Sequence, residues 1–187
     1  MRNPHNGHQE HFKEYLAALD VLVGGSGRYL NIKKGAAPFW LVAYDDVPEE
    51  GCTTAFTYGI SSVPNLAWVS GSPEIVISLN SSEEDWLLSL GSIACGLRGE
   101  CPFSYGDVLR FGKPLSHESE MNSYFLFWPT ILEESQQQLH LSDRVITFKQ
   151  AYPIFGTEAD AIAKMGAEKL FMMDGIDFSD ISRKKII

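Results

Sequence analysis

Residues 98–119 join the two halves of the chain and decide the fold; they read Arg98-Gly-Glu-Cys-Pro-Phe-Ser-Tyr-Gly-Asp-Val-Leu-Arg-Phe-Gly-Lys-Pro-Leu-Ser-His-Glu-Ser119. Gly99 is a typical helix stop, and Pro102 cannot continue a helix because its ring removes the amide donor. Tyr105-Gly106-Asp107 has the composition of a tight turn. The stretch therefore predicts the end of a helix, a turn, and a short extended segment over 108–111.

This join is rich in aromatic side chains for a loop. Phe103, Tyr105 and Phe111 all fall within it, although connecting segments are mostly polar. Such a loop either packs down as structure or offers a surface to a partner, and we favour packing. Trp68 poses the same question, because it sits among turn residues. It either caps the edge of the core, which we favour, or serves as an exposed anchor.

The segments before this join predict a helix, three strands and a second helix. Apolar residues at helical spacing favour a helix over 9–23, closed by Gly24-Gly25. Ser81 begins the second helix with Glu84 at capping-box spacing, and an apolar stripe continues to Leu97. The three strands, which are apolar or rich in β-branched and aromatic residues, are Phe39–Tyr44, Thr53–Ile60 and Glu74–Leu79.

Two further strands are predicted after the join. Residues 122–128 are almost wholly apolar and aromatic, which is typical of a strand buried on both faces. Residues 145–152 form the next strand. Between them, the polar segment 133–140 with its three consecutive glutamines is expected to be a loop.

The last part of the chain predicts one helix and a tail. The helix opens at Thr157 and closes at Gly175. The side chains expected to face inward are Ile162, Met165, Leu170 and Met173. The tail carries the basic cluster Arg183-Lys-Lys185, for which a solvated end is the expectation.

The order of these elements predicts an α+β fold. Runs of strands with helices at intervals, joined mainly by hairpin-length loops, form a sheet covered by helices. The length of 187 residues suits one domain with a substantial core. We expect a single domain over 1–187, with 1–8 poorly ordered and 9–183 forming the folded core.

The charge balance narrows the class of partner. Fifteen lysines and arginines against 24 acids give a formal charge of −9, which weighs against direct nucleic-acid binding because that affinity rests on neutralising phosphates. The charge suits a basic partner, although net charge also serves solubility alone. The longest apolar run, 38–44, is too short to cross a bilayer, and no secretory signal is visible. We expect a cytoplasmic protein with no membrane partner.

An enzyme would need a nucleophile, a paired acid and base, or a metal site. The best catalytic set is Cys101 with His117 and Asp107, since a Cys–His pair can activate a thiolate. A cysteine before a proline and among aromatic residues is, however, usually an inert packing residue. We therefore expect no catalytic residue and no cofactor.

Metal and disulfide sites are not expected. His5, His8 and His11 are spaced three apart, but Pro4 and Gly7 disfavour a helix that would bring them to one face. The three cysteines form no Cys-x-x-Cys pair and fit reduced packing residues: Cys52, Cys95 and Cys101.

A family resemblance appears in the join and on both sides of it. The join carries Gly-Glu-x-x-Phe-x-x-Gly-Asp over 99–107, followed by Pro114-Leu115 and Ser119. Upstream lies Thr54-x-x-Thr57-x-Gly59-Ile60-Ser61, and downstream lie the 145–152 strand leading into a helix and Asp180-Ile-Ser-Arg183. In this order, from about Phe39 to Arg183, the chain resembles the Suppressor of Fused domain family. It is more similar to the stand-alone bacterial members than to the longer animal proteins, because no second domain follows.

The resemblance implies a mixed, mostly antiparallel sheet flanked by helices and a module that binds proteins without catalysis. Animal members of the family hold a transcription factor through a short peptide that adds as a strand beside this join, and the aspartate of the Gly-Asp step contributes to the grip. Carried over, that residue is Asp107, with Tyr105 and Glu100 as neighbours; Trp68 completes the expected protein-binding set. The alternative for Asp107 is a turn residue that bonds its own backbone.

Stand-alone bacterial members are regarded as immunity proteins of polymorphic toxin systems. The resemblance therefore implies a protein that binds and neutralises a toxin domain, and the acidic balance suits a basic toxin such as a nuclease. The chain lacks the second domain that helps animal members to clamp their peptide. A scaffold with an unrelated partner is the alternative, and a Cys/His-dependent enzyme is the third possibility.

Overall fold

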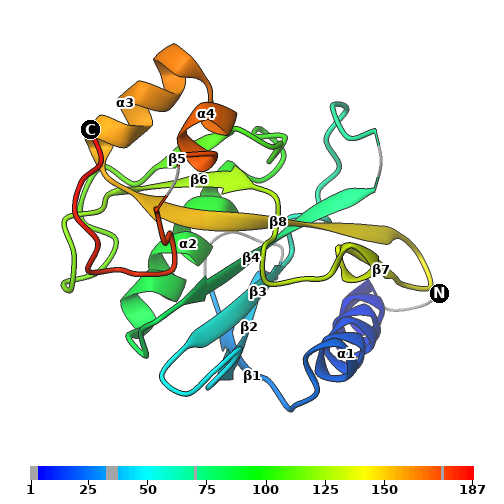
Figure 1. Cartoon of the computed structure of the whole chain (residues 1–187). Helices are drawn as coiled ribbons and strands as arrows, with labels where there is room; N and C mark the ends of the chain where they lie inside the picture. The colour runs from blue at the N-terminus through cyan, green and yellow to red at the C-terminus, as the bar shows by residue number, and fades with distance from the viewer. Residues whose placement is uncertain (1–3, 33–37, 70, 174) are drawn as a thin grey trace.

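A single sheet with helices on both faces organises the molecule (Figure 1). The computed structural model describes residues 4–32, 38–69, 71–173 and 175–187, with side chains from residue 9 onward. The sheet of the described residues has eight strands: β1 (Arg28–Asn31), β2 (Trp40–Asp45), β3 (Thr53–Tyr58), β4 (Ser72–Leu79), β5 (Val108–Arg110), β6 (Ser123–Phe127), β7 (Gln138–His140) and β8 (Val145–Ile154). The helices are α1 (Pro4–Val23), α2 (Glu84–Leu97), α3 (Gly156–Met165) and α4 (Ala167–Phe171), with a 3₁₀ turn at Glu134–Gln136.

The strand order is β1-β2-β3-β4-β8-β6-β5, and β7 continues the line of β6 along β8. The pairing of β4 with β8 is parallel, whereas the other pairings within the described residues are antiparallel. The expected mixed, mostly antiparallel sheet of an α+β domain is therefore confirmed. The long strand β8 holds the sheet together, because it contacts β4 on one edge and β6 and β7 on the other.

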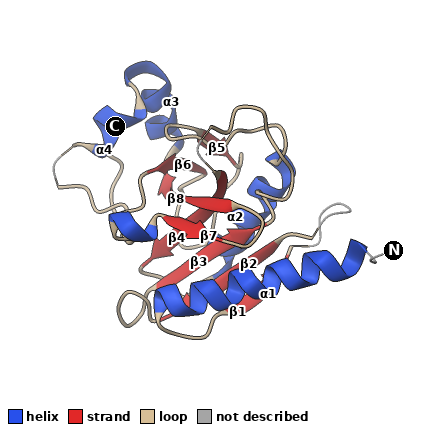
Figure 2. Cartoon of the chain, turned by 90° about the vertical axis from the view of Figure 1, so that its right-hand side faces the viewer, coloured by secondary structure: helices blue, strands red, loops and turns tan. Residues whose placement is uncertain are grey.

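Helices α1 and α2 lie on opposite faces of the sheet, and the alternation of side chains along β2 shows why. Leu41 and Ala43 pack in the cluster that contains α2, whereas Val42 and Tyr44 pack in the cluster that contains α1. Successive side chains of a strand point to opposite faces, so the continuous apolar run of β2 serves two cores. Figure 2 shows α1 lying across the β1–β3 end of the sheet.

Helices α3 and α4 cover the C-terminal half of β8, on the face of the sheet that also carries α1. Ile146 and Phe148 of β8 pack with the α1 cluster, and Tyr152 and Ile154, on the same face, pack with α3 and α4. Each fully buried side chain of this size contributes about 1.5–3 kcal/mol through the hydrophobic effect. One face of β8 thus carries α1 at one end and α3 and α4 at the other (Figure 1).

Helix α2 approaches β2 closely, and its start differs from the prediction. A β-carbon at Gly91 would lie 2.8 Å from the side chains of Ile32 and Leu41, so glycine permits the contact. The helix follows Glu83 without a side-chain cap. The hydroxyl of Ser81 instead accepts a bond from the Glu83 amide at 3.0 Å and donates to Glu118 at 2.6 Å.

The first helix begins earlier than the sequence indicates. It starts at Pro4 rather than Gln9, because proline in a first turn loses no helical hydrogen bond. The expectation that residues 1–8 are poorly ordered stays a prediction, because residues 1–3 and the side chains of 4–8 lie outside the described part. Two short strands were also missed: β1, a half-buried edge strand, and β7, which pairs with β8 within the segment predicted as a loop.

The last predicted helix is in fact two helices. Gly166 separates α3 from α4, and α4 ends at Phe171. Met165 is the last residue of α3 and Met173 lies beyond the end of α4; they are 39% and 41% exposed, and the prediction that they face inward was wrong. Ile162 and Leu170 are buried as predicted.

The tail is not wholly solvated. The Arg183 side chain is 7% exposed and forms a 2.7 Å ion pair with Glu158, whose side chain is fully buried. The expectation of a solvated basic end was therefore wrong for Arg183, because a buried carboxylate in α3 attracts it. Lys184 and Lys185 are exposed as expected.

Candidate protein-docking site

Asp107 fixes the turn of the join between α2 and β5. Its Oδ2 accepts a 2.7 Å hydrogen bond from the Ser104 amide, and the Cys101 thiol lies 3.6 Å from the same oxygen. The Gly106 amide donates to the Leu126 carbonyl at 2.7 Å, which ties the turn to the end of β6. The geometry thus contains the turn contact that the sequence offered as the alternative role of Asp107.

The aromatic residues of the join divide between core and surface. Phe103 is fully buried in the α2 cluster, where its backbone takes a positive φ of 52° that L-residues rarely adopt. Tyr105 is 38% exposed, and its ring contacts Phe127 and Trp128 edge-on at 6.0 and 5.9 Å between centroids. Packing of Phe103 therefore holds the loop rigid while Tyr105 faces outward.

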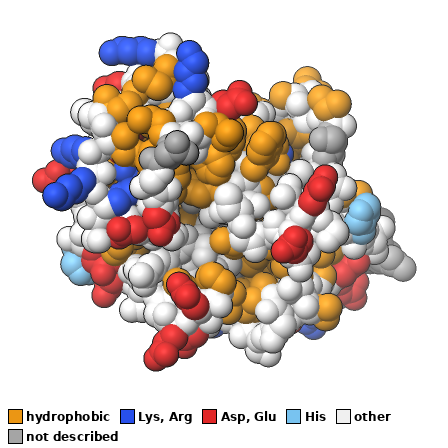
Figure 3. Space-filling view, in the orientation of Figure 1, with side chains coloured by type: hydrophobic (Ala, Val, Ile, Leu, Met, Phe, Trp, Pro, Cys, Tyr) orange, Lys and Arg blue, Asp and Glu red, His pale blue; other side chains and the backbone are white. Residues whose placement is uncertain are grey.

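Trp68 connects a second loop to this join. Its indole Nε1 donates a 3.0 Å hydrogen bond to the Pro102 carbonyl, and its ring packs against the α2 cluster. Trp68 thus caps the edge of the core, as the sequence favoured, while it remains partly exposed. Its neighbours Leu66 and Val69 are 107% and 97% exposed. The loop that carries them projects at the upper right of Figure 1, and Figure 3 shows hydrophobic side chains gathered there.

A pocket of about 250 Å³ opens between the two loops, above the start of β4 and β8. Lys149 of β8 enters it with Nζ 3.6 Å from the centre of the Tyr105 ring. Burial lowers the pKa of Lys149 and raises that of Tyr105, because each charged form loses water. The lining residues are Ala67, Trp68, Val69, Gly71, Pro73, Pro102, Ser104, Tyr105, Thr147 and Lys149.

The structure brings together two of the four predicted binding residues. Trp68 and Tyr105 line the same pocket, and Asp107 lies behind it as the support of the turn. Glu100 is exposed at the end of α2 and does not line the pocket. Asn65 bonds to the Gly99 carbonyl at 3.3 Å, which joins the Glu100 segment to the Trp68 loop. Lys149 was missed, because a lysine within a strand carries no motif in sequence.

The strand that follows the turn is an end strand of the sheet. Leu109 pairs with Tyr124 of β6, and the bonds of Asp107 and Phe111 also point toward β6. By alternation, Val108 and Arg110 direct their backbone amides and carbonyls away from β6. Arg110 forms a 2.7 Å ion pair with Asp160 of α3. An edge of this kind can accept an added strand.

The catalytic alternative finds no support in the surroundings of Cys101. Burial, and secondarily the Asp107 carboxylate, raises the pKa of the Cys101 thiol to about 11, which opposes thiolate formation. His117 instead bonds Asp85 of α2 through Nδ1 at 3.2 Å. The Cys101 sulfur accepts a 3.4 Å hydrogen bond from the Phe103 amide and lies 3.6 Å from the Asp107 carboxylate. Cys52 and Cys95 are buried, and Cys101 is partly buried.

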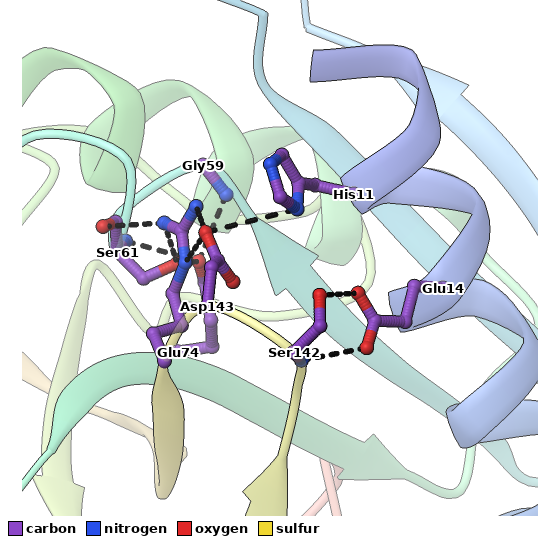
Figure 4. Close-up of polar contacts among 8 residues, drawn as sticks. His11, Glu14, Gly59, Ser61, Glu74, Ser142 and Asp143 are labelled. Atoms are coloured by element: carbon purple, nitrogen blue, oxygen red, sulfur yellow. Dashed lines mark hydrogen bonds and ion pairs between the residues drawn. The ribbon is translucent and has the colours of Figure 1, made fainter. Parts of the chain in front are cut away.

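A buried carboxylate supports the loop that carries Trp68. Glu74 of β4 is fully buried and accepts bonds from the Thr57 hydroxyl at 2.6 Å, the Gly59 amide at 2.9 Å, and the Ser61 amide and hydroxyl at 3.0 and 2.7 Å. Burial raises the pKa of Glu74, and this effect outweighs the hydrogen bonds, which lower it. The Arg144 guanidinium also donates to the Ser61 carbonyl at 2.8 Å. The threonine-glycine-serine pattern of the sequence is therefore a carboxylate cradle (Figure 4).

The same network joins α1 to the β7–β8 turn. His11 lies 3.7 Å from Asp143, and Glu14 accepts bonds from the Ser142 amide and hydroxyl at 2.6 and 2.7 Å (Figure 4). The side chains of His5 and His8 lie outside the described residues. In the part that is described, no three metal-ligating side chains come together. The helices of that part are also too short or too polar to span a membrane.

Comparisons with known proteins place this geometry in context. The family model described as Suppressor of fused protein (SUFU) matches residues 35–184. Immunity protein YqcF of Bacillus subtilis (strain 168) is 26% identical over 156 residues, which cover 79% of this chain and 81% of that protein.

Two solved structures share the fold. A Suppressor of fused homologue from Neisseria gonorrhoeae FA 1090 superposes with a TM-score of 0.76 and 17% identity, covering 96% of this chain and 98% of the other. A chain of the Sufu–Fu complex superposes with a TM-score of 0.66 and 13% identity, covering 93% of this chain and 91% of the other.

Proposed function

The chain belongs to the Suppressor of fused family, and from this premise we propose that it is an immunity-type protein that binds and neutralises a toxin domain. The name of the Bacillus subtilis relative supports the immunity role. The Sufu–Fu complex supports a protein as the kind of partner. In this proposal the protein acts in the cytoplasm as one domain, with a folded core over 9–183, and needs neither cofactor nor catalytic residue.

The observation that carries the proposal is an exposed apolar surface on a rigid support. We define the docking patch by apolar side chains that line the Lys149 pocket, contact Tyr105 or lie exposed in the Trp68 loop: Leu66, Trp68, Val69, Tyr105 and Trp128. Tryptophan and tyrosine are the residues that most often supply binding energy at protein interfaces. Phe103, Asp107 and the Glu74 cradle hold the two loops in place. A preorganised surface of this type loses little entropy on binding.

The edge of β5 extends the same surface. Asp107 immediately precedes β5, and Val108 and Arg110 leave backbone groups free to pair with an added strand. Strand addition would give affinity through the backbone, while the docking patch and Glu100 would select the sequence. In this proposal Tyr105 and Trp68 anchor the partner, and Glu100 is a charge at the rim of the interface. Asp107 supports the loop that carries Tyr105.

The charge of the chain suggests the chemistry of the toxin. A formal charge of −9 attracts a basic surface over long range and speeds association. A nuclease has such a surface, because it must neutralise the phosphates of its substrate. We propose a basic toxin domain, of which a nuclease is the leading example.

Co-expression of the chain with the toxin domain encoded beside its gene tests the proposal. Wild-type protein should restore growth and form a stable complex, whereas Asp107→Arg should lose both. Glu50→Arg is the matched charge reversal, because Glu50 is exposed in the β2–β3 connection at the opposite end of the sheet. It should protect like wild type.

The outcomes separate the alternatives. A gene with no toxin neighbour, together with capture of an unrelated partner through the docking patch, would favour the scaffold. Loss of protection in Cys101→Ala with unchanged stability would favour the enzyme. Retained protection in Cys101→Ser with loss in Asp107→Arg would favour binding.

A further inference from the structure

Lys149 differs from Arg144 and Arg183, two other cations that the fold partly removes from water. The buried or half-buried guanidinium groups of Arg144 and Arg183 each meet a carboxylate, at 2.6 Å from Asp143 and 2.7 Å from Glu158. Lys149 is half-buried, yet among the described residues no carboxylate pairs with it. Its ammonium instead lies over the Tyr105 ring as a cation–π contact. A cation that has lost part of its water without a counter-charge is destabilising unless a ligand supplies one.

The pocket around Lys149 has room for one side chain. Its volume of about 250 Å³ lies below the range of about 300–1,000 Å³ that holds small-molecule ligands. Lys149 is the one charged side chain among the described residues that line it, and Ser104 and Thr147 add hydroxyl groups. Apolar walls from Trp68, Val69 and Tyr105 would shield an ion pair formed there from water.

The surroundings select a protein as the source of the anion. The chain carries a net charge of −9, which repels a polyanion such as a nucleic acid. Exposed apolar side chains lie beside the pocket: Val69 lines it, Leu66 belongs to the same loop, and both are almost fully in solvent. Apolar side chains around a central charged pocket form the arrangement that excludes water from a protein interface.

We propose that the Lys149 pocket binds an aspartate or glutamate side chain of the protein partner, which pairs with the Lys149 ammonium between Trp68 and Tyr105. This inference rests on the proposed function only in that the docking patch binds a protein. It adds a chemical rule for the partner: a surface that is basic overall presents one acidic side chain flanked by apolar residues. Long-range attraction then brings the partners together, and the acidic side chain fixes their register.

Peptide selection tests the rule without knowledge of the toxin. A library of random peptides displayed on phage is selected on the full chain, and the selected peptides are measured by calorimetry. We expect enrichment of aspartate or glutamate beside aromatic or aliphatic residues. Lys149→Met, which keeps the aliphatic stem and removes the charge, should weaken these peptides by about 30-fold or more, because it leaves their carboxylate unpaired.

The matched control is Lys113→Met. Lys113 also lies over an aromatic ring, with Nζ 5.2 Å from the centre of Phe111, but it is exposed and belongs to another pocket. Its variant should bind the selected peptides like wild type. Replacement of the acidic residue of a selected peptide by glutamine should cost wild type as much affinity as Lys149→Met does, and the two changes should not add.

Three outcomes of the peptide experiment would overturn the inference. These are a pool without acidic residues, selected peptides that bind Lys149→Met as tightly as wild type, or displacement of the peptides by inorganic phosphate or a single-stranded oligonucleotide at equal concentration. Failure of toxin protection with the peptide result intact would instead overturn the proposed function alone. Toxin binding that persists in Lys149→Met at full affinity would overturn this inference and leave the proposed function standing.

Discussion

Arg183 and Glu158 face each other as a two-pronged buried ion pair, with Nη1 2.7 Å from Oε1 and Nη2 2.8 Å from Oε2. Arg183 also donates to the Pro153 carbonyl at 3.0 Å and lies over the Phe155 and Phe178 rings. Glu158 in turn accepts bonds from the Phe155 and Ile186 amides at 3.0 and 3.1 Å. One ion pair therefore fastens the tail to β8 and α3.

Arg183→Met should destabilise the fold strongly. Removal of the guanidinium leaves the Glu158 carboxylate buried without a counter-charge, which costs about 3–5 kcal/mol. Urea denaturation followed by circular dichroism measures the loss, and Lys184→Met, one residue along and exposed, should stay within about 0.5 kcal/mol of wild type. The double variant Arg183→Met with Glu158→Leu should recover much of the loss; a double variant no more stable than the single one would contradict this account.

Glu74→Gln should preserve the fold and change its pH dependence. The amide oxygen can still accept the bonds from Gly59 and Ser61, so the variant should unfold within about 1–2 kcal/mol of wild type near neutral pH. Because burial raises the folded-state pKa of Glu74 above its ordinary 4.5, the folded state holds the proton more tightly, and this group's stabilisation falls as pH rises from about 4.5 through the folded pKa.

The glutamine variant lacks this titration. Its stability relative to wild type should therefore increase with pH across that window. Urea denaturation at a series of pH values above 4.5 provides the test, with Glu74→Leu as the variant that breaks the cradle and destabilises at every pH. A constant difference between Glu74→Gln and wild type over the series would show that the Glu74 pKa is not raised.

Tyr105→Ala should weaken the partner without unfolding the chain. The ring is partly exposed and covers Lys149, so its loss removes an anchor and a cation–π contact. We expect about 10- to 100-fold weaker binding of the cognate toxin domain by calorimetry. Phe103→Ala, in the same loop but fully buried, should instead lower the unfolding free energy by about 3–5 kcal/mol. Unchanged affinity in Tyr105→Ala would remove the docking patch from the interface.

Asp107→Asn separates the shape of the turn from its charge. The amide oxygen can still accept the bond from the Ser104 amide, so the loop should keep its conformation. If the carboxylate itself contacts the toxin, affinity should fall toward that of Asp107→Arg. If Asp107 serves only the turn, the variant should bind like wild type, and a crystal structure of Asp107→Asn would confirm that the loop is unchanged.

Cys101 should react slowly with alkylating reagents. With the thiol pKa at about 11, only about one thousandth of it is thiolate at pH 8. Labelling by iodoacetamide, located by mass spectrometry, should accelerate as pH approaches 11. Asp107→Asn removes a negative charge that raises this pKa, so it should speed labelling at pH 8. Rapid labelling of the wild-type thiol at neutral pH would instead favour an activated nucleophile.

The sequence predicted the sheet well where a strand or helix has its own strong pattern. The apolar run that forms β2 and the stripe of α2 from Trp86 to Leu97 were located correctly, because local propensity and burial agree there. It failed where a partner distant in sequence decides the structure. β7 forms because β8 offers an edge, and Arg183 is buried because Glu158 is.

The candidate site was predicted in part for the same reason. Trp68 and Tyr105 attract notice as aromatic residues among turn residues, and the structure places them in one pocket. Lys149 does not, since its importance depends on the loops that fold over it and on the absence of a paired carboxylate among the described residues. The Thr-x-Gly-x-Ser motif indicates a structural contact. Thr57, Gly59 and Ser61 all donate hydrogen bonds to the buried Glu74, which supports the loop that carries Trp68.

The parallel pairing of β4 with β8 has a consequence for the order in which the chain can fold. The whole of α2, β5, β6 and β7 lies between these two strands in sequence. During synthesis, β4 must leave its edge open until the ribosome has released β8, since contacts between distant segments form late and slowly. Until then the nascent chain exposes the edge of β4 to aggregation. The pocket between the Trp68 and Tyr105 loops also cannot form, because β8 supplies Thr147 and Lys149 to it.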